Sequence, residues 1–186
     1  MPEENDVTSS AVSPYNNLSV KKDRVVGFTC GAFDLLHAGH ALMLAEAREQ
    51  CDHLIVAVQS DPSLDRPEKN SPVQSYEERL TMVESIRWVD DVICYDTEQD
   101  LYSLLVDLAP DVRIVGADWR GKEFTGHDLD INVYFNSRDH GWSTSDLRAR
   151  VHAAEEKKNL VKKRTEASFN SVANLDMMDK HGKRSV

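Results

Sequence analysis

The chain has 186 residues, of which 40% are hydrophobic, and it carries a formal net charge of −10 at pH 7. This length suits one domain with a real core plus some additional chain. The acidic balance argues against a nucleic-acid or anionic membrane partner. The sequence contains no run of about 18 apolar residues, so no membrane-spanning helix is predicted. An anionic substrate would need a local pocket built from Lys, Arg, His and helix N-termini.

The first 22 residues are polar and rich in Ser, Asn and Pro, so we predict a disordered N-terminal segment at 1–22. Its start, Met1–Asp6, is acidic and has no apolar stretch, unlike a signal peptide. The chain has three cysteines outside any C-x-x-C pair: Cys30, Cys51 and Cys94. Free thiols of this kind are typical of a reducing compartment, so we expect a cytoplasmic location.

Strands and helices are predicted to alternate from about residue 24 onward. Short β-branched runs predict strands at 24–30, 53–59, 92–95, 112–116 and 131–135. Helices are expected at 38–48, from the capping box at Ser75–Glu78 to about Ile86, at 98–108 before Pro110, and from Ser143 through about residue 156. Alternation of this kind predicts a single α/β domain at 23–156, a Rossmann-like doubly wound parallel sheet with helices on both faces.

The spacing of apolar residues indicates which residues lie on one face of each predicted helix. Leu42 and Ala45 fall at helical spacing in the first helix, and Leu80, Val83 and Ile86 are expected to point inward in the second.

A polar C-terminal extension is predicted at 157–186. It opens with a basic run of Lys157, Lys158, Lys162, Lys163 and Arg164. We expect a solvated helix extension or a flexible tail, and contact with a partner chain or an acidic surface is the alternative.

Three polar segments follow predicted strands, at 31–40, 116–121 and 138–145. In open parallel sheets, ligands bind beyond the carboxyl ends of the strands. The predicted topology therefore brings these three segments to one edge of the sheet.

The first segment is Gly31-Ala-Phe-Asp-Leu-Leu-His-Ala-Gly-His40. Its helix N-terminus offers unpaired N–H groups, which suit a phosphate, and His37 and His40 are close enough to face one ligand. Gly39 has no side chain and would let a phosphate approach the backbone. The two histidines would also suit a metal site, but no third ligand has an obvious spacing. The segment is neither a G-x-G-x-x-G fingerprint nor a Walker P-loop, which disfavours a hydride-transfer enzyme and a P-loop kinase.

The third segment, Arg138-Asp-His-Gly-Trp-Ser-Thr-Ser145, ends where a helix N-cap is expected. Hydroxyl and N–H groups at Ser143 and Thr144 would hold phosphate oxygens, and Arg138 would add a bidentate contact. A plain capped helix is the alternative.

These segments resemble the two signatures of the cytidylyltransferase-like nucleotidyltransferases, G-x-F-D-x-x-H-x-G-H and R-T-x-G-x-S-T-[ST]. Within that superfamily the chain resembles bacterial glycerol-3-phosphate cytidylyltransferase over about residues 24–152. The likeness includes Ser75-Tyr-Glu-Glu-Arg79, Ile86-Arg-Trp-Val-Asp90 and Gly116-Ala-Asp-Trp-Arg-Gly-Lys122. Asp139, His140 and Trp142 depart from the second signature.

The resemblance implies transfer of CMP from CTP to a small phosphorylated acceptor, with glycerol 3-phosphate preferred and pyrophosphate released. It implies catalytic roles for His37, His40 and Arg138. The implied nucleotide-binding residues are Cys30, Gly31, Ala32, Phe33, Gly39, Gly116, Asp118, Trp119, Ser143, Thr144 and Ser145. The implied acceptor-phosphate residues are Asp34, Lys69 and Arg79. A homodimer is also implied.

Several of these roles have alternatives. Asp118 would accept a hydrogen bond from the exocyclic amine of cytosine or adenine, and Trp119 would stack on the base, unless the loop is only a structural turn. Arg66 is an alternative to Lys69, and Arg79 would otherwise form a surface ion pair with Glu77 or Glu78. Asp34 is expected to be structural or near the metal rather than a base.

In the expected mechanism an acceptor phosphate oxygen attacks the α-phosphate of CTP in line. His37 and His40 donate hydrogen bonds to the five-coordinate phosphorus centre, while Arg138, Ser143 and Thr144 hold the β- and γ-phosphates. Mg²⁺ is expected to bridge the triphosphate. The alternatives are ATP as donor, a sugar phosphate or phosphoethanolamine as acceptor, a non-catalytic nucleotide-binding module, and a metal-binding protein.

Overall fold

The computed structural model of the chain describes the backbone of residues 23–182 and the side chains of residues 23–166. The predicted disordered segment at 1–22 therefore lies outside the described residues. The chain divides into two units, with the boundary between Trp142 and Ser143. The predicted domain boundary at residue 156 stays a prediction.

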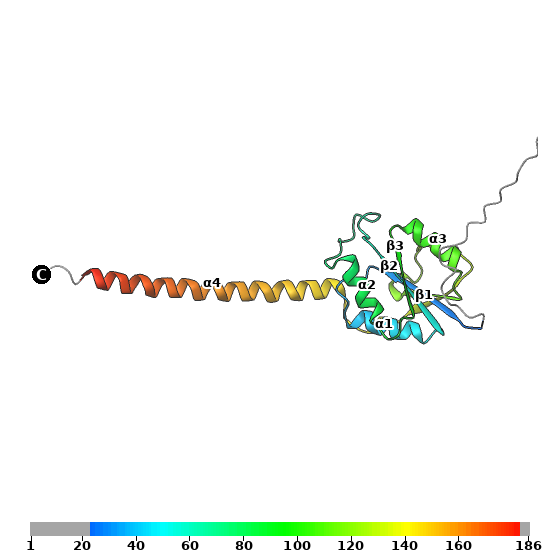
Figure 1. The fold of residues 1–186 in the computed structure, drawn as a ribbon, viewed down its shortest axis with the longest axis horizontal. Helices are drawn as coiled ribbons and strands as arrows, with labels where there is room; N and C mark the ends of the chain where they lie inside the picture. The colour runs from blue at the N-terminus through cyan, green and yellow to red at the C-terminus, as the bar shows by residue number, and fades with distance from the viewer. Residues whose placement is uncertain (1–22, 183–186) are drawn as a thin grey trace, which may run out of the picture. The chain divides into compact units, whose positions relative to one another are not determined.

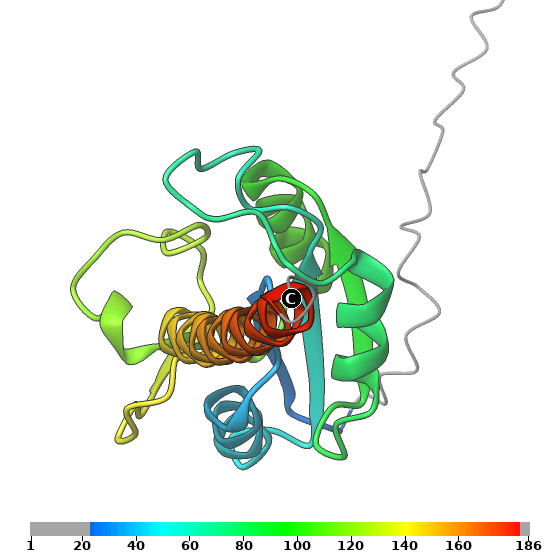
Figure 2. The same cartoon turned by 90° about the vertical axis from the view of Figure 1, so that its left-hand side faces the viewer.

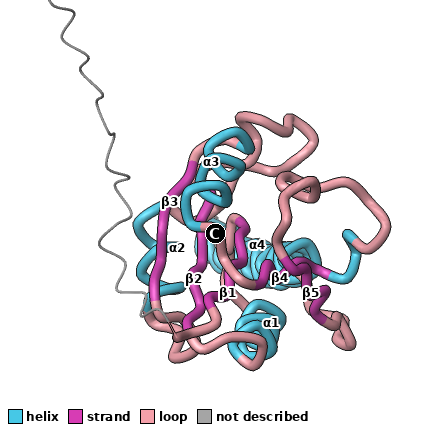
Figure 3. The backbone as a smooth tube through the Cα atoms, turned by 90° about the vertical axis from the view of Figure 1, so that its right-hand side faces the viewer, coloured by secondary structure: helices cyan, strands magenta, loops and turns pink. Residues whose placement is uncertain are grey.

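The first unit contains one parallel sheet (Figure 1), whose strand order β3-β2-β1-β4-β5 can be followed in Figure 3. The strands are β1 Val26–Gly31, β2 His53–Gln59, β3 Asp91–Tyr95, β4 Val112–Gly116 and β5 Asn132–Asn136. The helices of this unit are α1 Ala38–Arg48, α2 Tyr76–Glu84, α3 Glu98–Leu108 and the short 3-10 helix η1 Ala117–Trp119. The predicted α/β fold and its alternation are confirmed.

Helices cover both faces of this sheet, as predicted. Every residue of β2 is buried, so alternate side chains of this strand enter different layers. One layer joins β2 to α1 and α2 through Leu44, Ala47, Leu54, Val56, Val58 and Val83. The other joins β2 to α3 through Ile55, Ala57, Leu101, Leu104 and Leu105. Figures 2 and 3 show α1 and α3 on opposite sides of the strands.

The strand order reverses beside β1, which pairs with β2 on one side and with β4 on the other. A reversal of this kind leaves a crevice beyond the carboxyl ends of the two central strands, where ligands of open α/β sheets bind. The ends in question are Gly31 of β1 and Gly116 of β4. The fold thus brings the first two polar segments of the sequence to the same edge of the sheet, beyond the carboxyl ends of β1 and β4.

The helices begin and end for identifiable reasons. The predicted capping box of α2 is present, since Glu78 N–H donates to Ser75 Oγ (3.2 Å) and Ser75 N–H to Glu78 Oε2 (2.7 Å). Helix α3 ends at Ala109, which is left-handed with φ 41°, directly before Pro110. In α1 the buried positions are Gly39, Leu44 and Ala47. Leu42, noted for its helical spacing, is 49% exposed.

The second unit is one helix, α4 Thr144–Gly182. Ser143 caps it as predicted, because Asp146 N–H donates to Ser143 Oγ at 3.1 Å. The helix continues through the basic run, and the side chains of residues 151–166 are all exposed. The C-terminal extension is therefore helical as far as Gly182, and the side chains of its described part, 157–166, are exposed. No described helix is long and apolar enough to cross a membrane.

Candidate functional site

Two histidines form the N-terminal cap of α1. His37 is the N-cap residue, and its Nδ1 accepts a hydrogen bond from Gly39 N–H at 3.0 Å. The backbone N–H of His37 in turn donates to His40 Nδ1 at 3.4 Å. This reciprocal pattern is a capping box in which imidazoles take the places of the usual Ser or Thr and Glu or Gln. The residues expected to bind phosphate therefore also start the helix.

The cap fixes which nitrogen of each ring carries the proton. A neutral imidazole has one donor and one acceptor nitrogen. Because Nδ1 accepts a backbone N–H in both His37 and His40, the proton of each neutral ring lies on Nε2. Burial, with further repulsion from His37 and Arg138 and some opposition from Asp34, lowers the pKa of His40 from 6.5 to about 4. At pH 7 His40 is thus a neutral Nε2–H donor.

The loop between β1 and α1 is held by the segment before α2. Asp34 is 6% exposed, and its Oδ1 accepts hydrogen bonds from the N–H groups of Val73 (2.9 Å) and Gln74 (3.0 Å). The side chain of Gln74 accepts from Leu35 N–H at 2.6 Å. Phe33 and Leu35 have φ values of 50° and 48°, a strained region for such residues. The structural role expected for Asp34 is therefore visible, and its contact with an acceptor phosphate stays a prediction.

Arg79 lies beneath the same loop. It is 1% exposed, and its Nη1 donates to the carbonyls of Ala32 (2.7 Å) and Gln59 (2.6 Å) while Nη2 donates to the carbonyl of Ser60. Arg79 therefore ties the end of β1 to the end of β2, which differs from both expectations. The surface ion pair is wrong, because the side chain is buried. Contact with an acceptor phosphate stays a prediction, and the burial of the guanidinium weighs against it.

The segment after β4 meets the third polar segment. Arg138 Nη1 forms an ion pair with Asp118 Oδ1 at 3.2 Å, with both side chains about half exposed. A Cβ at Gly116 would lie 2.7 Å from Asp118 Oδ1, so a larger residue there would displace the Asp118 carboxylate. Trp119 is partly buried. The expectation that these segments converge is confirmed for residues 116–142.

His140 lies directly against the N-terminus of α1, a contact that the sequence did not predict. A Cβ placed on Gly39 would be 2.8 Å from His140 Cε1 and 2.9 Å from His37 Cε1. The ring of His140 stacks on Trp142, with centroids 5.4 Å apart. The approach to the Gly39 backbone, expected to be open to a phosphate, is thus flanked by two imidazoles. The only sequence signal was that His140 and Trp142 depart from the second signature.

Other predicted site residues are not joined to this group. Lys69 is exposed in the loop between β2 and α2. Arg66, the alternative acceptor contact, is engaged with Gln59 (2.8 Å) and Glu98 (3.0 Å). Ser143, Thr144 and Ser145 begin the second unit, so their roles in binding nucleotide stay predictions. Cys30 is a free thiol whose pKa is raised by burial.

No group of three His, Cys, Asp or Glu side chains arranged as metal ligands occurs among the residues that the structure describes. The carboxylate closest in sequence to the two histidines, Asp34, is occupied by backbone N–H groups. The side chains of this site therefore offer no cage for Mg²⁺, and a triphosphate-bound Mg²⁺ stays a prediction.

Comparison with known proteins places this geometry in a family. Residues 28–150 match the family described as Cytidylyltransferase-like. The chain is 37% identical over 139 residues to the bifunctional protein HldE of Campylobacter concisus, covering 74% of this chain and 29% of that protein. It is 40% identical over 138 residues to HldE of Gluconacetobacter diazotrophicus, covering 69% and 28%. The chain thus spans less than a third of the length of these curated relatives.

A solved structure shares the fold. It is the lipopolysaccharide core biosynthesis protein from Thermoplasma volcanium, with a TM-score of 0.54 and 24% identity over 63% of this chain and 99% of that one. The family match covers both histidines, Arg138, strands β2 to β5 and β1 from Phe28 onward. The chain belongs to the cytidylyltransferase-like family of nucleotidyltransferases.

Proposed function

We propose that this protein transfers a nucleotidyl group from a nucleoside triphosphate to a sugar phosphate and releases pyrophosphate. The observation that carries the proposal is the pair of histidines at the start of α1, His37 and His40, whose cap hydrogen bonds leave each Nε2 as the donor nitrogen of a neutral ring. The HldE relatives support a sugar-phosphate acceptor over the glycerol 3-phosphate expected from the sequence. ATP and CTP both remain candidate donors, since Asp118 suits the exocyclic amine of either base.

The chemistry follows from the protonation of the two rings. An acceptor phosphate oxygen attacks the α-phosphorus and a new P–O bond forms. The bond from the α-phosphorus to the α,β-bridging oxygen breaks, and that oxygen leaves as a terminal oxygen of pyrophosphate. The acceptor is already an anion at pH 7, so no strong base is needed. His40, which is neutral at pH 7, donates its Nε2–H to an oxygen on which charge accumulates. His37 donates its Nε2–H beside it, and neither ring gives up a proton. Removal of one such donor typically costs about 3–4 kcal/mol of barrier height.

Positive charge for the leaving group is proposed to come from Arg138. In the free protein this side chain pairs with Asp118, and because the pair is half exposed it exchanges partners at small cost. Arg138 would then contact the β- and γ-phosphates with its guanidinium. Mg²⁺ bound to the triphosphate would neutralise further charge there.

Pyrophosphate release from a matrix of substrates tests this proposal. The donors are the four nucleoside triphosphates, and the acceptors are a heptose phosphate, a hexose phosphate, glycerol 3-phosphate and phosphoethanolamine. We expect turnover with a sugar phosphate and either ATP or CTP. Turnover with glycerol 3-phosphate alone would reject the sugar-phosphate acceptor. Nucleotide binding without turnover on any acceptor would favour the non-catalytic module.

Variants of the two histidines test the mechanism. His40→Ala and His37→Ala are each expected to lower kcat by about 100-fold or more. His127→Ala is the matched control, because His127 is exposed and bonds only locally, to the Phe124 carbonyl. Full activity in both signature variants would reject the proposed chemistry even if the protein binds nucleotide.

A further inference from the structure

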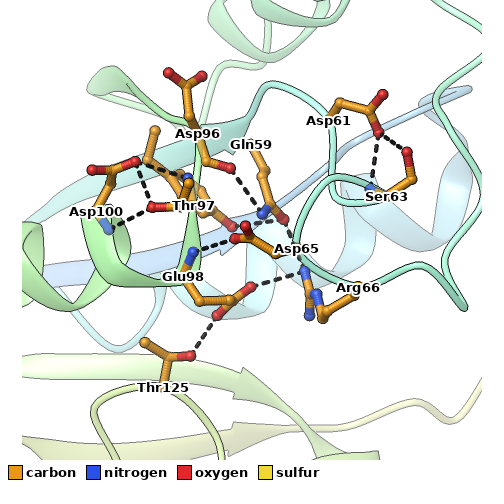
Figure 4. Close-up of polar contacts among 11 residues, drawn as sticks. Gln59, Asp61, Ser63, Asp65, Arg66, Asp96, Thr97, Glu98, Asp100 and Thr125 are labelled. Atoms are coloured by element: carbon orange, nitrogen blue, oxygen red, sulfur yellow. Dashed lines mark hydrogen bonds and ion pairs between the residues drawn. The ribbon is translucent and has the colours of Figure 1, made fainter.

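Glu98, in the first turn of α3, contacts two different loops with its two carboxylate oxygens (Figure 4). Its Oε1 forms an ion pair with Arg66 Nη2 at 3.0 Å. Its Oε2 accepts a hydrogen bond from Thr125 Oγ1. Arg66 belongs to the loop between β2 and α2, and Thr125 to the segment between β4 and β5. One side chain therefore joins two segments that are far apart in sequence.

The loop that contains Arg66 is anchored to the sheet through the same contacts. Arg66 Nη2 also donates to Gln59 Oε1 at 2.8 Å, and Gln59 Nε2 donates to the Asp96 carbonyl at 3.2 Å. The N–H of Glu98 donates to Asp65 Oδ2 at 2.6 Å. The ends of β2 and β3, the start of α3 and this loop thus form one network, as Figure 4 shows.

The segment that contains Thr125 is anchored from below by β4. Arg113 of β4 is 4% exposed and donates to the Thr125 carbonyl. Its guanidinium also lies over the ring of Phe124, 5.0 Å from the centroid. Thr125 is therefore held by its backbone to β4 and by its hydroxyl to Glu98.

The ion pair between Arg66 and Glu98 is partly sheltered from solvent, which strengthens its hold on the loop after β2. Both side chains are 30% exposed, which is less than for the Arg138–Asp118 pair. Charge pairs with reduced access to water are screened less by solvent and salt than exposed ones. Glu98 is thus suited to hold Arg66 in place rather than to sample many partners.

The two joined segments carry predicted contacts to different substrates. The loop after β2 carries Lys69, expected at the acceptor phosphate, and the segment after β4 carries Asp118 and Trp119, expected at the base. We propose that Glu98 is a positioning residue that sets the spacing between the acceptor-side and base-side segments of the nucleotidyl-transfer site. This inference rests on the proposed function, because it assigns the two segments to the two substrates of one reaction.

The expected kinetic effect is selective. In-line attack requires the reacting atoms to lie about 3–3.5 Å apart, so a shift of about 1 Å in one loop lowers the rate strongly. Loss of the Glu98 contacts should therefore raise KM for the acceptor and lower kcat. It should change KM for the nucleotide little, because Arg113 of β4 still holds the segment after β4 through the Thr125 carbonyl when the Glu98 contact is lost.

A double-mutant cycle tests the role of Glu98 in the active enzyme. Glu98→Gln is expected to raise acceptor KM about tenfold, with KM for the nucleotide within twofold. Arg66→Ala and Thr125→Val remove one contact each, and their effects on acceptor KM should be non-additive, because both act through Glu98. The matched control is Glu77→Gln, which removes the same charge from the first turn of α2. Additive effects, or an unchanged acceptor KM in Glu98→Gln, would overturn the proposal.

Hydrogen exchange on the full chain tests the same link without activity. Glu98→Gln should increase amide exchange in both 61–72 and 120–127, and Arg66→Ala alone should increase it in 120–127 as well. Coupled exchange in a protein that turns over no substrate pair would retain the link and reject the proposed function. Turnover in the wild type with unchanged exchange in 120–127 of Arg66→Ala would reject the link and retain the function.

Discussion

The imidazole rings of His37 and His40 stack with their centroids 4.1 Å apart and an interplanar angle of 24°. A second positive charge at this distance is unfavourable, and burial of His40 adds to that cost. His40 is therefore neutral under physiological conditions, and its hydrogen-bond donor does not depend on protonation near pH 7.

Acid pH should destabilise the fold through His40. The unfolded side chain titrates near 6.5 and the folded one near 4, so above pH 6.5 neither state binds the proton. Between pH 6.5 and 4 only the unfolded chain takes it up, and the free energy of unfolding falls by up to about 3 kcal/mol. Urea unfolding at pH 7.5, 6 and 5 should show a smaller loss in His40→Gln. An equal loss in both proteins would contradict the shifted pKa.

Gly39→Ala should separate stability from activity. Alanine favours a helix by up to about 1 kcal/mol over glycine, but its Cβ would lie under 3 Å from carbons of His37 and His140. One or both rings must move, which disturbs the capping geometry of His37. We expect kcat to fall by about tenfold or more, with a midpoint of thermal unfolding near that of the wild type. An unchanged kcat would show that the rings of His37 and His140 can move aside without disturbing catalysis.

Arg79→Met should destabilise the protein by about 3 kcal/mol, because three carbonyls at the ends of β1 and β2 lose a charged donor. Arg79→Lys should recover only part of this loss, since an ammonium lacks the planar fork. Arg87→Met is the control, as Arg87 is exposed and lies over the ring of Trp88. Chemical denaturation measures all three. A cost below about 1 kcal/mol for Arg79→Met would mean that water replaces the guanidinium easily.

Truncation after Glu156 should leave the thermal midpoint within about 1 °C, because the side chains of residues 157–166 are exposed. The helical signal in circular dichroism should fall with the lost residues. A larger drop that depends on protein concentration would instead indicate that this part of α4 contacts a second copy, and sedimentation of both forms would then test the predicted homodimer.

Helices and strands were predicted best from the sequence where the residue types favour the local structure that the fold contains. The five strands follow β-branched runs, and the boundaries of β2 and β4 match the prediction because glycine, proline and charged residues flank them. The start of α4 was predicted from Ser143. Its length was not, because residues 151–166 lack a buried stripe and a solvated helix resembles a tail in composition.

Long-range contacts of polar side chains were the main omissions. Arg79 is charged and follows two glutamates, so local pattern suggests an exposed residue, whereas the carbonyls that it holds come from β1 and β2. Similarly, 101 positions separate Gly39 from His140, and no periodicity links them. Glu98 was placed at the start of a helix, but its two loop contacts depend on how β2 and β4 are spaced in the sheet.

His37 has two separate roles at one position: it caps the N-terminus of α1, and it supplies the Nε2–H group of the proposed chemistry. Any good N-cap residue would start α1, so His37→Ser should preserve folding while removing the Nε2–H group. Mutational drift at this residue would then produce a stable, well-folded protein without transferase chemistry. A descendant of this chain that keeps its fold but carries serine at this position would be a candidate for a nucleotide sensor rather than an enzyme.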